Sequence, residues 1–492
     1  MSALSLLPLL AWAVHAQDLP PQAAGTFYPD SAQELRSMVD SFLAGASTGS
    51  VKGEILGVLS PHAGYVYSGE TAGKAYALLK GRSYDTVVIL SAAHRFQVPG
   101  AATLSEGSLS TPLGKVPVDA ATVKRLRLLS PLIEAIPAAF QGEHAAEVQL
   151  PFLQRALKEG FKVVPLLMNT DDPQKCRAVG AAVAKVLKSA KTLLVVSSDL
   201  SHYPERDAAR IVDRATLEAL VRRPDDPAYF RLANRALMQK GVPGLDTTFC
   251  GEAGVLAALY AMREVGGVGK LIHYTNSGEV PAGDPSRAVG YAALAWTRGS
   301  IRPRVKPLSR ESRKNLLQLA RRALTLKVAK GEDPRGAFWR DPEWNLPEAV
   351  FVTLIRRDPS AAPGRLRGCV GSLAPEMPLA EAVQYFAIQA GLHDGRFPRV
   401  EASELAGLKI EISRLSPFRV VKSHAEIKPG QGVVVAQGER RGLFLPQVWA
   451  QIPDKTEFLG EVCEQKARLP RECWKDPNTR IEVFDDEAFE EP

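Results

Sequence analysis

Several apolar runs in this sequence lead directly into residues that could do chemistry. LGVLSP is followed by His62, VVILSAA by His94, and LVVSS by Asp199 and His202. Cys250 stands in DTTFCGEAG, between a loop and a helix-like stretch. Imidazole and thiolate groups together suit a borderline or soft divalent metal. A histidine titrates near neutral pH, so His202 could also act as a general acid or base.

The apolar runs are the elements that must position these side chains. They alternate with helix-like stretches, which predicts an α/β domain whose sheet is mainly parallel or mixed and buried on both faces by helices. The carboxyl ends of parallel strands meet at one edge of a sheet, where open α/β folds bind their ligands. We therefore expect the polar residues to converge. The runs are DTVVIL (85–90), FKVVPLLM (161–168), KTLLVVSS (191–198) and AVGYAALAW (288–296).

A basic, proline-containing segment predicts a linker at residues 298–309. Between Arg298 and Lys330 the sequence has eleven Lys and Arg but one acid, whereas the whole chain of 492 residues carries only +7. A local excess of this kind is typical of a solvated linker and helix face, so we expect no nucleic-acid partner. After the linker, strand-like runs lie among loops rich in Pro and Gly, which predicts an α+β domain at 310–492.

The amino terminus predicts export. Residues 1–16 contain an apolar block that is too short to span a membrane and that ends in small residues, as a signal peptide does. We expect the protein to be periplasmic or secreted if this block is a signal peptide, and cytoplasmic if it is not. No internal run is long enough for an integral membrane span. The five cysteines lack CxxC spacing, so neither a disulfide scaffold nor a structural zinc site is expected.

The motifs of the first domain resemble the Memo family, from about Gly25 to Trp296. They are SPHAGYVYSG, VVILSAAHR, TPLGKVPVD, EHAAEVQLPFL, VVSSDLSHY, CGEAGV and VGYAALAW. This family shares its fold with the class III extradiol dioxygenases, the LigB-like non-haem iron enzymes. The resemblance implies a LigB-like domain at 17–297.

The Memo resemblance also implies a metal site. The two histidines and the cysteine that bind metal in Memo proteins correspond to His62, His94 and Cys250, and His202 matches the proton-transferring histidine of the dioxygenases. Those enzymes have a carboxylate where this chain has Cys250. Iron is the favoured divalent metal, and a thiolate ligand makes copper or zinc possible as well.

The second domain resembles the AMMECR1 domain, from about Leu308 to Glu491. The matching motifs are LRGCVGSL, AGLHDGRFPRV, ELAGLKIEISRLSP, GLFLPQV and FLGEVCEQKARLP. Its RGC motif places Arg367 and Cys369 beside glycines, where a ligand can approach the backbone. Asp394 and Arg396 in HDGRF are expected to form a charge pair. These four residues are a candidate ligand site.

Three functions are compatible with these residues. The first is an oxidoreductase of the extradiol type that acts on an aromatic or similar small molecule, with His202 moving the proton and Asp199 orienting it through a hydrogen bond that raises the pKa of His202. The second is a non-catalytic scaffold that binds metal or peptide. The third is a hydrolase with a triad in which Cys250 is the nucleophile, His202 the base and Asp199 the residue that orients the base. Bacterial and archaeal chains of both types belong to one system with a radical-SAM protein, so the resemblance implies such a partner.

Overall fold

A computed structural model describes residues 17–46, 51–188, 191–224, 226–299, 307–334, 336–358 and 365–492. The predicted signal peptide at 1–16 lies outside these residues, as do positions 300–306 of the predicted linker. The chain divides into two compact units. The first consists of the described residues up to Asp213 and from Pro243 to Gly299. The second combines Arg214–Val242 with the described residues from Pro307 to the end.

An eight-stranded mixed sheet forms the centre of the first unit, in the order β10-β11-β2-β9-β3-β8-β4-β7. The strands β2, β9, β3 and β8 are parallel, and β11 and β10 add antiparallel pairs at one edge. All residues of β2, β3 and β9 are buried, which explains their nearly continuous apolar sequences. The strands are β2 (Ile55–Ser60), β3 (Thr86–Ala92), β4 (Ala101–Thr103), β7 (Ile133–Ala135), β8 (Lys162–Met168), β9 (Thr192–Ser197), β10 (Gly267–Asn276) and β11 (Gly290–Arg298).

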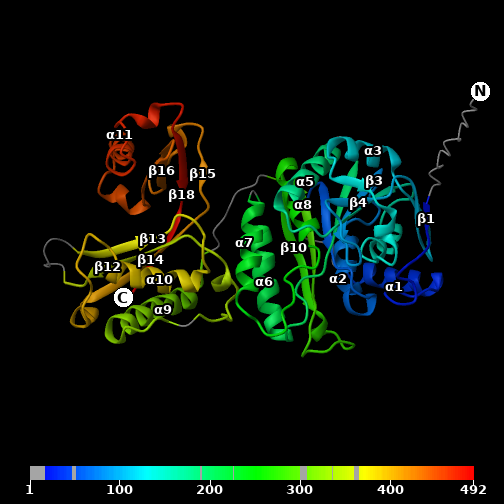
Figure 1. Ribbon diagram of the computed structural model, residues 1–492, viewed down its shortest axis with the longest axis horizontal. Coiled ribbons are helices and arrows are strands. Elements are labelled where there is room, and N and C mark those ends of the chain that lie inside the picture. The colour runs from blue at the N-terminus through cyan, green and yellow to red at the C-terminus, as the bar shows by residue number, and fades with distance from the viewer. Residues whose placement is uncertain are drawn as a thin grey trace, which may run out of the picture. The chain divides into compact units, whose positions relative to one another are not determined.

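Helices flank this sheet, so the predicted α/β fold class is confirmed (Figure 1). Helix α2 packs against β2, β10 and β11, whereas α8 packs against β3 and β9. A separate three-stranded sheet has the order β1-β5-β6. The helices and the remaining strands of the first unit are β1 (Gln17–Leu19), α1 (Ala32–Ala44), α2 (Tyr65–Ala77), β5 (Gly107–Thr111), β6 (Gly114–Pro117), α3 (Ala120–Leu129), α4 (Leu150–Ala156), α5 (Pro173–Leu187) and α8 (Glu252–Val265). Helix α6 (Arg206–Arg222) begins in the first unit and ends in the second.

The second unit contains two four-stranded antiparallel sheets, in the orders β13-β12-β14-β19 and β15-β18-β16-β17. Helices α9 and α10 pack together and against the first of these sheets (Figure 1). The predicted α+β class of this part is confirmed. The elements are α7 (Pro227–Met238), α9 (Arg310–Lys330), β12 (Val350–Arg356), β13 (Leu366–Gly371), α10 (Leu379–Leu392), β14 (Leu408–Leu415), β15 (Arg419–Val420), β16 (Gly432–Gln437), β17 (Arg440–Phe444), α11 (Lys455–Glu461), β18 (Arg480–Phe484) and β19 (Asp486–Glu490).

A buried ion-pair network joins Arg214–Val242 to the rest of the second unit. Glu348 is 1% exposed and pairs with Arg222 and with Arg414, whose nitrogen lies 2.9 Å from the carboxylate. Burial opposes ionisation of Glu348, but the two guanidinium groups keep its pKa lowered. Removing one partner from such a network leaves a buried charge uncompensated. The sequence pattern did not predict this grouping.

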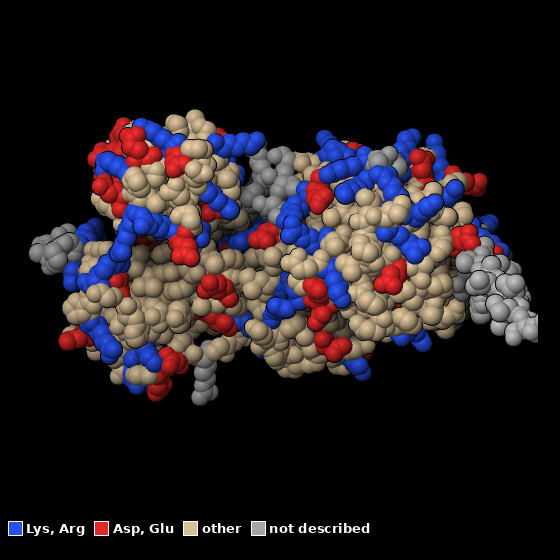
Figure 2. Space-filling view, turned by 45° about the horizontal axis from the view of Figure 1, so that its top comes forward, with Lys and Arg blue, Asp and Glu red and all other residues tan. Residues whose placement is uncertain are grey.

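Charged side chains of both signs are interspersed on the face of the molecule in Figure 2. Lys and Arg occur there in several groups with Asp and Glu nearby, and uncharged or apolar residues cover much of the face.

The close contact between α5 and α8 generates a prediction about stability. A Cβ atom at Gly180 would lie 2.4 Å from the carbonyl oxygen of Ala257 and 2.8 Å from Cβ of Tyr260. Because the backbone of α8 would have to shift, we expect Gly180→Ala to lower the free energy of unfolding by about 1–3 kcal/mol in chemical denaturation. Gly45→Ala is the control, since its nearest contact is 3.5 Å away. Equal stability of the two variants would contradict this packing.

Candidate metal centre

Three neighbouring parallel strands bring the predicted residues to one edge of the main sheet. His62 lies two positions after the end of β2, His94 two positions after β3, and Asp199 two positions after β9. Cys250 precedes α8, whose first residue is Glu252. The order β2-β9-β3 places these strand ends side by side. The expected convergence is therefore present.

His62, His94 and Cys250 form a compact group. Nε2 of His62 lies 3.0 Å from Sγ of Cys250. The rings of His62 and His94 meet edge to face, with centroids 5.0 Å apart. One donor atom from each of the three residues lies within 4.8 Å of the other two. This spacing can be spanned by a single metal ion, whose nitrogen and sulfur ligands bind at roughly 2.0–2.3 Å.

The hydrogen bonds around Ser197 determine which nitrogen of His62 carries the proton. The Ser197 hydroxyl donates to the carbonyl of Ala145 at 2.6 Å and accepts from Nε2 of Gln149 at 2.8 Å. Its proton is thus committed, so Nδ1 of His62, 3.1 Å away, must be the donor. The lone pair of His62 is then on Nε2, which faces Cys250. Burial also lowers the pKa of His62 to about 3, which keeps the ring neutral.

Glu143 orients His94 in the same way. Its carboxylate accepts from the backbone N–H of His94 at 2.6 Å and from Nδ1 of the ring at 3.0 Å. Burial acts to raise the pKa of Glu143, but the hydrogen bond from His94 and the other contacts lower it to about 2. Because an ionised carboxylate can only accept, Nδ1 of His94 is protonated and Nε2 is left to bind a metal.

Cys250 completes the donor set but needs a cation to ionise. Burial raises the pKa of its thiol well above the ordinary value, and the nearby Asp199 adds to the shift. The backbone N–H of Asp199 points at Sγ from 3.2 Å. A bound metal would reverse this balance, because a coordinating thiol is deprotonated. Two Nε2 lone pairs and one sulfur therefore fit a borderline or soft divalent metal.

Asp199 and His202 do not interact as we expected. Oδ1 of Asp199 accepts from the backbone N–H groups of His62 at 2.8 Å and Ala63 at 3.3 Å, and no hydrogen bond joins it to His202 in the described structure. Burial lowers the pKa of His202, and the charge of Asp199 opposes this shift without outweighing it. The expected hydrogen bond and raised pKa are therefore wrong. The carboxylate is committed to the backbone that follows β2.

The same observations bear on a hydrolase triad. Sγ of Cys250 lies 3.0 Å from Nε2 of His62, and Nε2 of His202 is buried with no hydrogen-bond partner among the described residues. Without an Asp199–His202 hydrogen bond, the orienting contact of such a triad is absent from the described residues.

Four contributors to the site were not assigned from the sequence: Glu143, His144, Gln149 and Ser197. The ring of His144 stacks on that of Phe27 at 4.1 Å and on that of His94 at 4.9 Å. Burial lowers the pKa of His144 to about 3. Glu143 and His144 stand out in EHAAEVQLPF as polar residues ahead of an apolar helix, which was the available signal. Ser197 and Gln149 gave none, since each is an ordinary polar residue in its segment.

The four candidate residues of the AMMECR1-like part separate into two groups. The side chain of Arg396 binds both oxygens of Asp394, at 2.9 and 2.7 Å, and that carboxylate accepts from the backbone N–H of Cys369 at 2.8 Å. Arg367 is instead 2% exposed and makes two hydrogen bonds of 2.9 Å with Glu404. The ligand site at these residues stays a prediction.

Asp213 supports the segment that carries His202. Its fully buried carboxyl accepts from the backbone N–H of Ser201 at 2.9 Å and from the hydroxyl of Tyr274 at 2.8 Å. A Cβ atom at Gly290 would lie 2.0 Å from Oδ2, so glycine is needed there. Burial raises the pKa of Asp213 to about 7.

This buried carboxyl predicts a pH-dependent stability. Its pKa is raised from 3.8 in the unfolded chain to about 7, so the folded state holds an extra proton between these values. The contribution to stability is complete below the lower pKa and is lost as the pH rises through the higher one. In denaturation at pH 5 and pH 8, Asp213→Asn should gain roughly 2–3 kcal/mol relative to the parent between the two conditions. Parallel pH profiles would contradict this assignment.

Comparison with known proteins gives two family matches and several relatives. A family model described as Memo-like protein matches residues 20–295, and the AMMECR1 model matches residues 317–489. The MEMO1 family protein of Nitrosopumilus maritimus is 36% identical over 282 residues, which are 56% of this chain and 98% of the relative. That of Methanococcoides burtonii is 35% identical over 278 residues, with 56% and 98% covered.

Among solved structures, an uncharacterized protein from Pyrococcus horikoshii shares 37% sequence identity with this chain. The match covers 37% of this chain and 93% of the other, with a TM-score of 0.35. The Memo-like model, in contrast, spans more than half of the present chain, and the MEMO1 relatives match over nearly their whole length. The chain therefore belongs to the Memo-like protein family and joins its Memo part to a carboxyl-terminal AMMECR1 domain.

Proposed function

We propose that this protein is a metal-dependent oxidoreductase of the extradiol type that acts on an aromatic or similar small molecule. His62, His94 and Cys250 would hold a divalent metal, with iron favoured and copper or zinc possible. The observation that carries the proposal is the orientation of the two imidazoles. Ser197 accepts a hydrogen bond from Nδ1–H of His62, and Glu143 accepts one from Nδ1–H of His94. Both Nε2 lone pairs are therefore available beside the sulfur of Cys250.

The metal, when bound, supplies Lewis-acid chemistry and open positions for oxygen ligands. The protein supplies a group for proton transfer and the contacts that position the ligands. His202 lies on the segment after β9, and its pKa, lowered by burial, leaves the ring neutral at pH 7. Nε2 of His202 is buried and has no hydrogen-bond partner among the described residues, and we propose that it accepts a proton from a substrate hydroxyl. Ser197, Gln149 and Glu143 keep the ligand rings in place.

A scaffold that binds metal or peptide without turnover is the second candidate. The observation that favours it is the sulfur donor, because Cys250 stands where the dioxygenases have a carboxylate. A softer donor set shifts the preference away from iron and towards metals such as zinc and copper(I). Oxygen uptake by the metal-loaded protein with phenolic compounds separates the two candidates. In either case we propose that a radical-SAM protein is the partner, and co-purification tests it.

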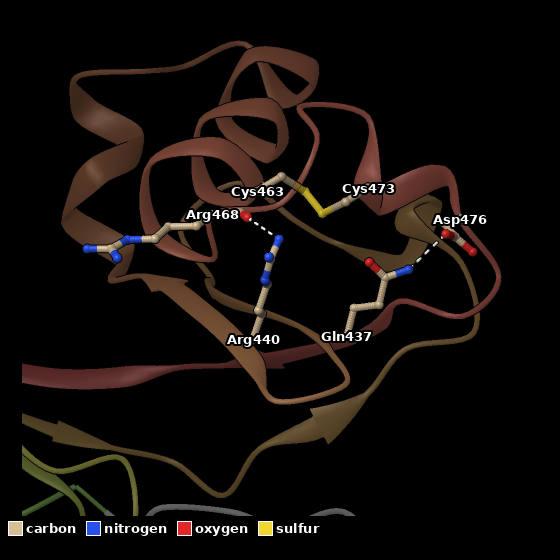
Figure 3. The surroundings of a disulfide bond; sticks show 6 residues. All are labelled: Gln437, Arg440, Cys463, Arg468, Cys473 and Asp476. Carbon is tan, nitrogen blue, oxygen red and sulfur yellow. Dashed lines mark hydrogen bonds between the residues drawn. A yellow bond between two sulfur atoms is a disulfide. The ribbon is translucent and has the colours of Figure 1, made fainter.

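A disulfide bond supports export. Cys463 and Cys473 are joined by a disulfide bond in the second unit (Figure 3). Disulfides persist in oxidising compartments and are rare in the cytosol. Among the described residues, no helix is long and apolar enough to cross a membrane. We therefore propose that the chain acts outside the cytoplasm.

The disulfide leads to a test of compartment. Hydrogen bonds secure its surroundings, since Arg440 donates to the carbonyl of Arg468 at 2.9 Å and Gln437 donates to Asp476 at 2.8 Å (Figure 3). When thiols are blocked in intact cells of the source organism, Cys463 and Cys473 should remain unmodified until a reductant is added. Mass spectrometry that finds both thiols free and alkylated would contradict export.

The metal site is tested by removing its ligands. His62→Ala, His94→Ala and Cys250→Ala should each reduce bound metal from about one ion per chain to a small fraction, because a coordinate bond is lost. The fold should survive, since apolar burial holds the strands. Metal analysis of protein purified without chelator gives the stoichiometry, and circular dichroism checks the fold. Gln174→Ala is a control on the exposed start of α5. Unchanged metal in His94→Ala would refute the assignment.

A further inference from the structure

The RGC motif presents a thiol on the face of its sheet that helices α9 and α10 do not cover. Val352 and Leu354 of β12 belong to the core that these helices form with the sheet (Figure 1). Because side chains alternate along a strand, Thr353 lies on the opposite face. Cys369 of β13 is directly across from Thr353 in the register, so its side chain lies on that face as well.

Asp394 and Arg396 fix the backbone of Cys369 from the edge of the sheet. The N–H of Cys369 donates to Oδ2 of Asp394 at 2.8 Å, and its carbonyl accepts from Nη2 of Arg396 at 3.0 Å. Strand β13 is at the edge, so these two side chains take the place of a further strand. Arg367 does not take part, because it is buried against Glu404. The HDGRF motif therefore holds the thiol-bearing residue in one position.

Two neighbours of the Cys369 thiol favour its ionised form. The hydroxyl of Thr353 donates to Sγ at 3.3 Å, and the guanidinium of Arg396 acts on the sulfur as a positive charge. Burial has the larger effect and raises the pKa of Cys369, so the thiol is protonated at rest. The sulfur becomes a nucleophile only when it gives up this proton, which a carbonyl oxygen of a ligand can take.

Arg396 can bind an anion beside this thiol. Its Nε and Nη2 atoms hold Asp394 at 2.9 and 2.7 Å, whereas Nη1 makes no hydrogen bond within the described residues. The side chain is 55% exposed, so a ligand can reach it. Guanidinium groups bind carboxylates through their N–H donors. A carboxylate on Nη1 would lie next to Cys369, because Nη2 of the same group contacts the carbonyl of that residue.

The short span between guanidinium and thiol restricts the ligand. Both groups act at residue 369, so the carboxylate and the carbon that reacts with the sulfur must be adjacent in the ligand. Glu411 of β14 lies across Thr353 from Cys369, on the same face of the sheet. A second carboxylate on the ligand would meet this acid, and like charges repel. These contacts favour a small acid with one carboxylate.

We propose that Cys369 and Arg396 form a second ligand site, which takes a small 2-oxo acid. Arg396 binds the carboxylate, and Sγ of Cys369 adds to the neighbouring carbonyl carbon. The S–C bond forms as the π bond of the carbonyl breaks, and the thiol proton passes to the carbonyl oxygen. The product is a thiohemiketal, so no oxidant, reductant or leaving group is required. This site does not depend on the metal centre.

Iodoacetate and iodoacetamide test the anion preference in the full-length chain, because they differ only in the group next to the reacting carbon. Mass spectrometry of peptides gives the alkylation rate of Cys369 separately from the other thiols. We expect iodoacetate to react at Cys369 about fivefold faster than iodoacetamide, the factor for two unit charges near 4 Å in water. Arg396→Gln should remove this preference, whereas Arg396→Lys keeps the charge and should retain it. Arg399→Gln, at an exposed arginine of the same loop, is the matched control and should leave the preference unchanged.

Protection of Cys369 tests the covalent step. At ten times its half-protecting concentration, pyruvate should slow alkylation by iodoacetamide about tenfold. Propanoate has the carboxylate but no carbonyl, and at the same concentration it should protect far less. Equal protection by the two acids would overturn the covalent step. Equal reagent preference in the parent and in Arg396→Gln would overturn the role of Arg396, and either result contradicts the proposed site.

Discussion

The hydrogen bonds at Nδ1 of His62 and His94 decide what this edge of the sheet can bind. A neutral imidazole has one donor and one acceptor nitrogen, and the partner of one fixes the role of the other. Ser197 and Glu143 accept hydrogen bonds from Nδ1–H of His62 and of His94, respectively. The two rings therefore present Nε2 lone pairs beside the sulfur of Cys250. Loss of either partner would let a ring reverse its tautomer. The Glu143 carboxylate holds His94 directly, and the Gln149 amide holds the Ser197 hydroxyl that contacts His62.

The positions of the site residues could be predicted from the sequence because they follow from strand topology. His62 and His94 each come after a nearly continuous apolar run, and parallel strands must end at the same edge. The role of Asp199 could not be predicted in this way. Its spacing from His202 suggested a local pair, but its Oδ1 atom instead accepts from the backbone N–H of His62, which follows β2 and is 137 residues away in sequence. Hydrogen-bond partners between distant segments leave no local pattern.

In the second unit, too, contacts between distant segments could not be predicted from the sequence. The antiparallel sheets of the AMMECR1 domain could be expected from short strand-like runs among turns. The inclusion of Arg214–Val242 could not, because it involves contacts between distant segments, such as the ion pair of Arg222 with Glu348. Likewise, the spacing of the five cysteines indicated no pairing, whereas the fold brings Cys463 and Cys473 together. Packing between segments decides these features.

X-ray absorption at the metal edge tests the central claim most directly. The protein should be expressed with iron and purified in full length without chelator, under anaerobic reducing conditions. We expect one sulfur scatterer at roughly 2.3 Å together with the multiple-scattering signature of two imidazoles. A spectrum with neither sulfur nor imidazole around the bound metal would contradict the assignment of His62, His94 and Cys250.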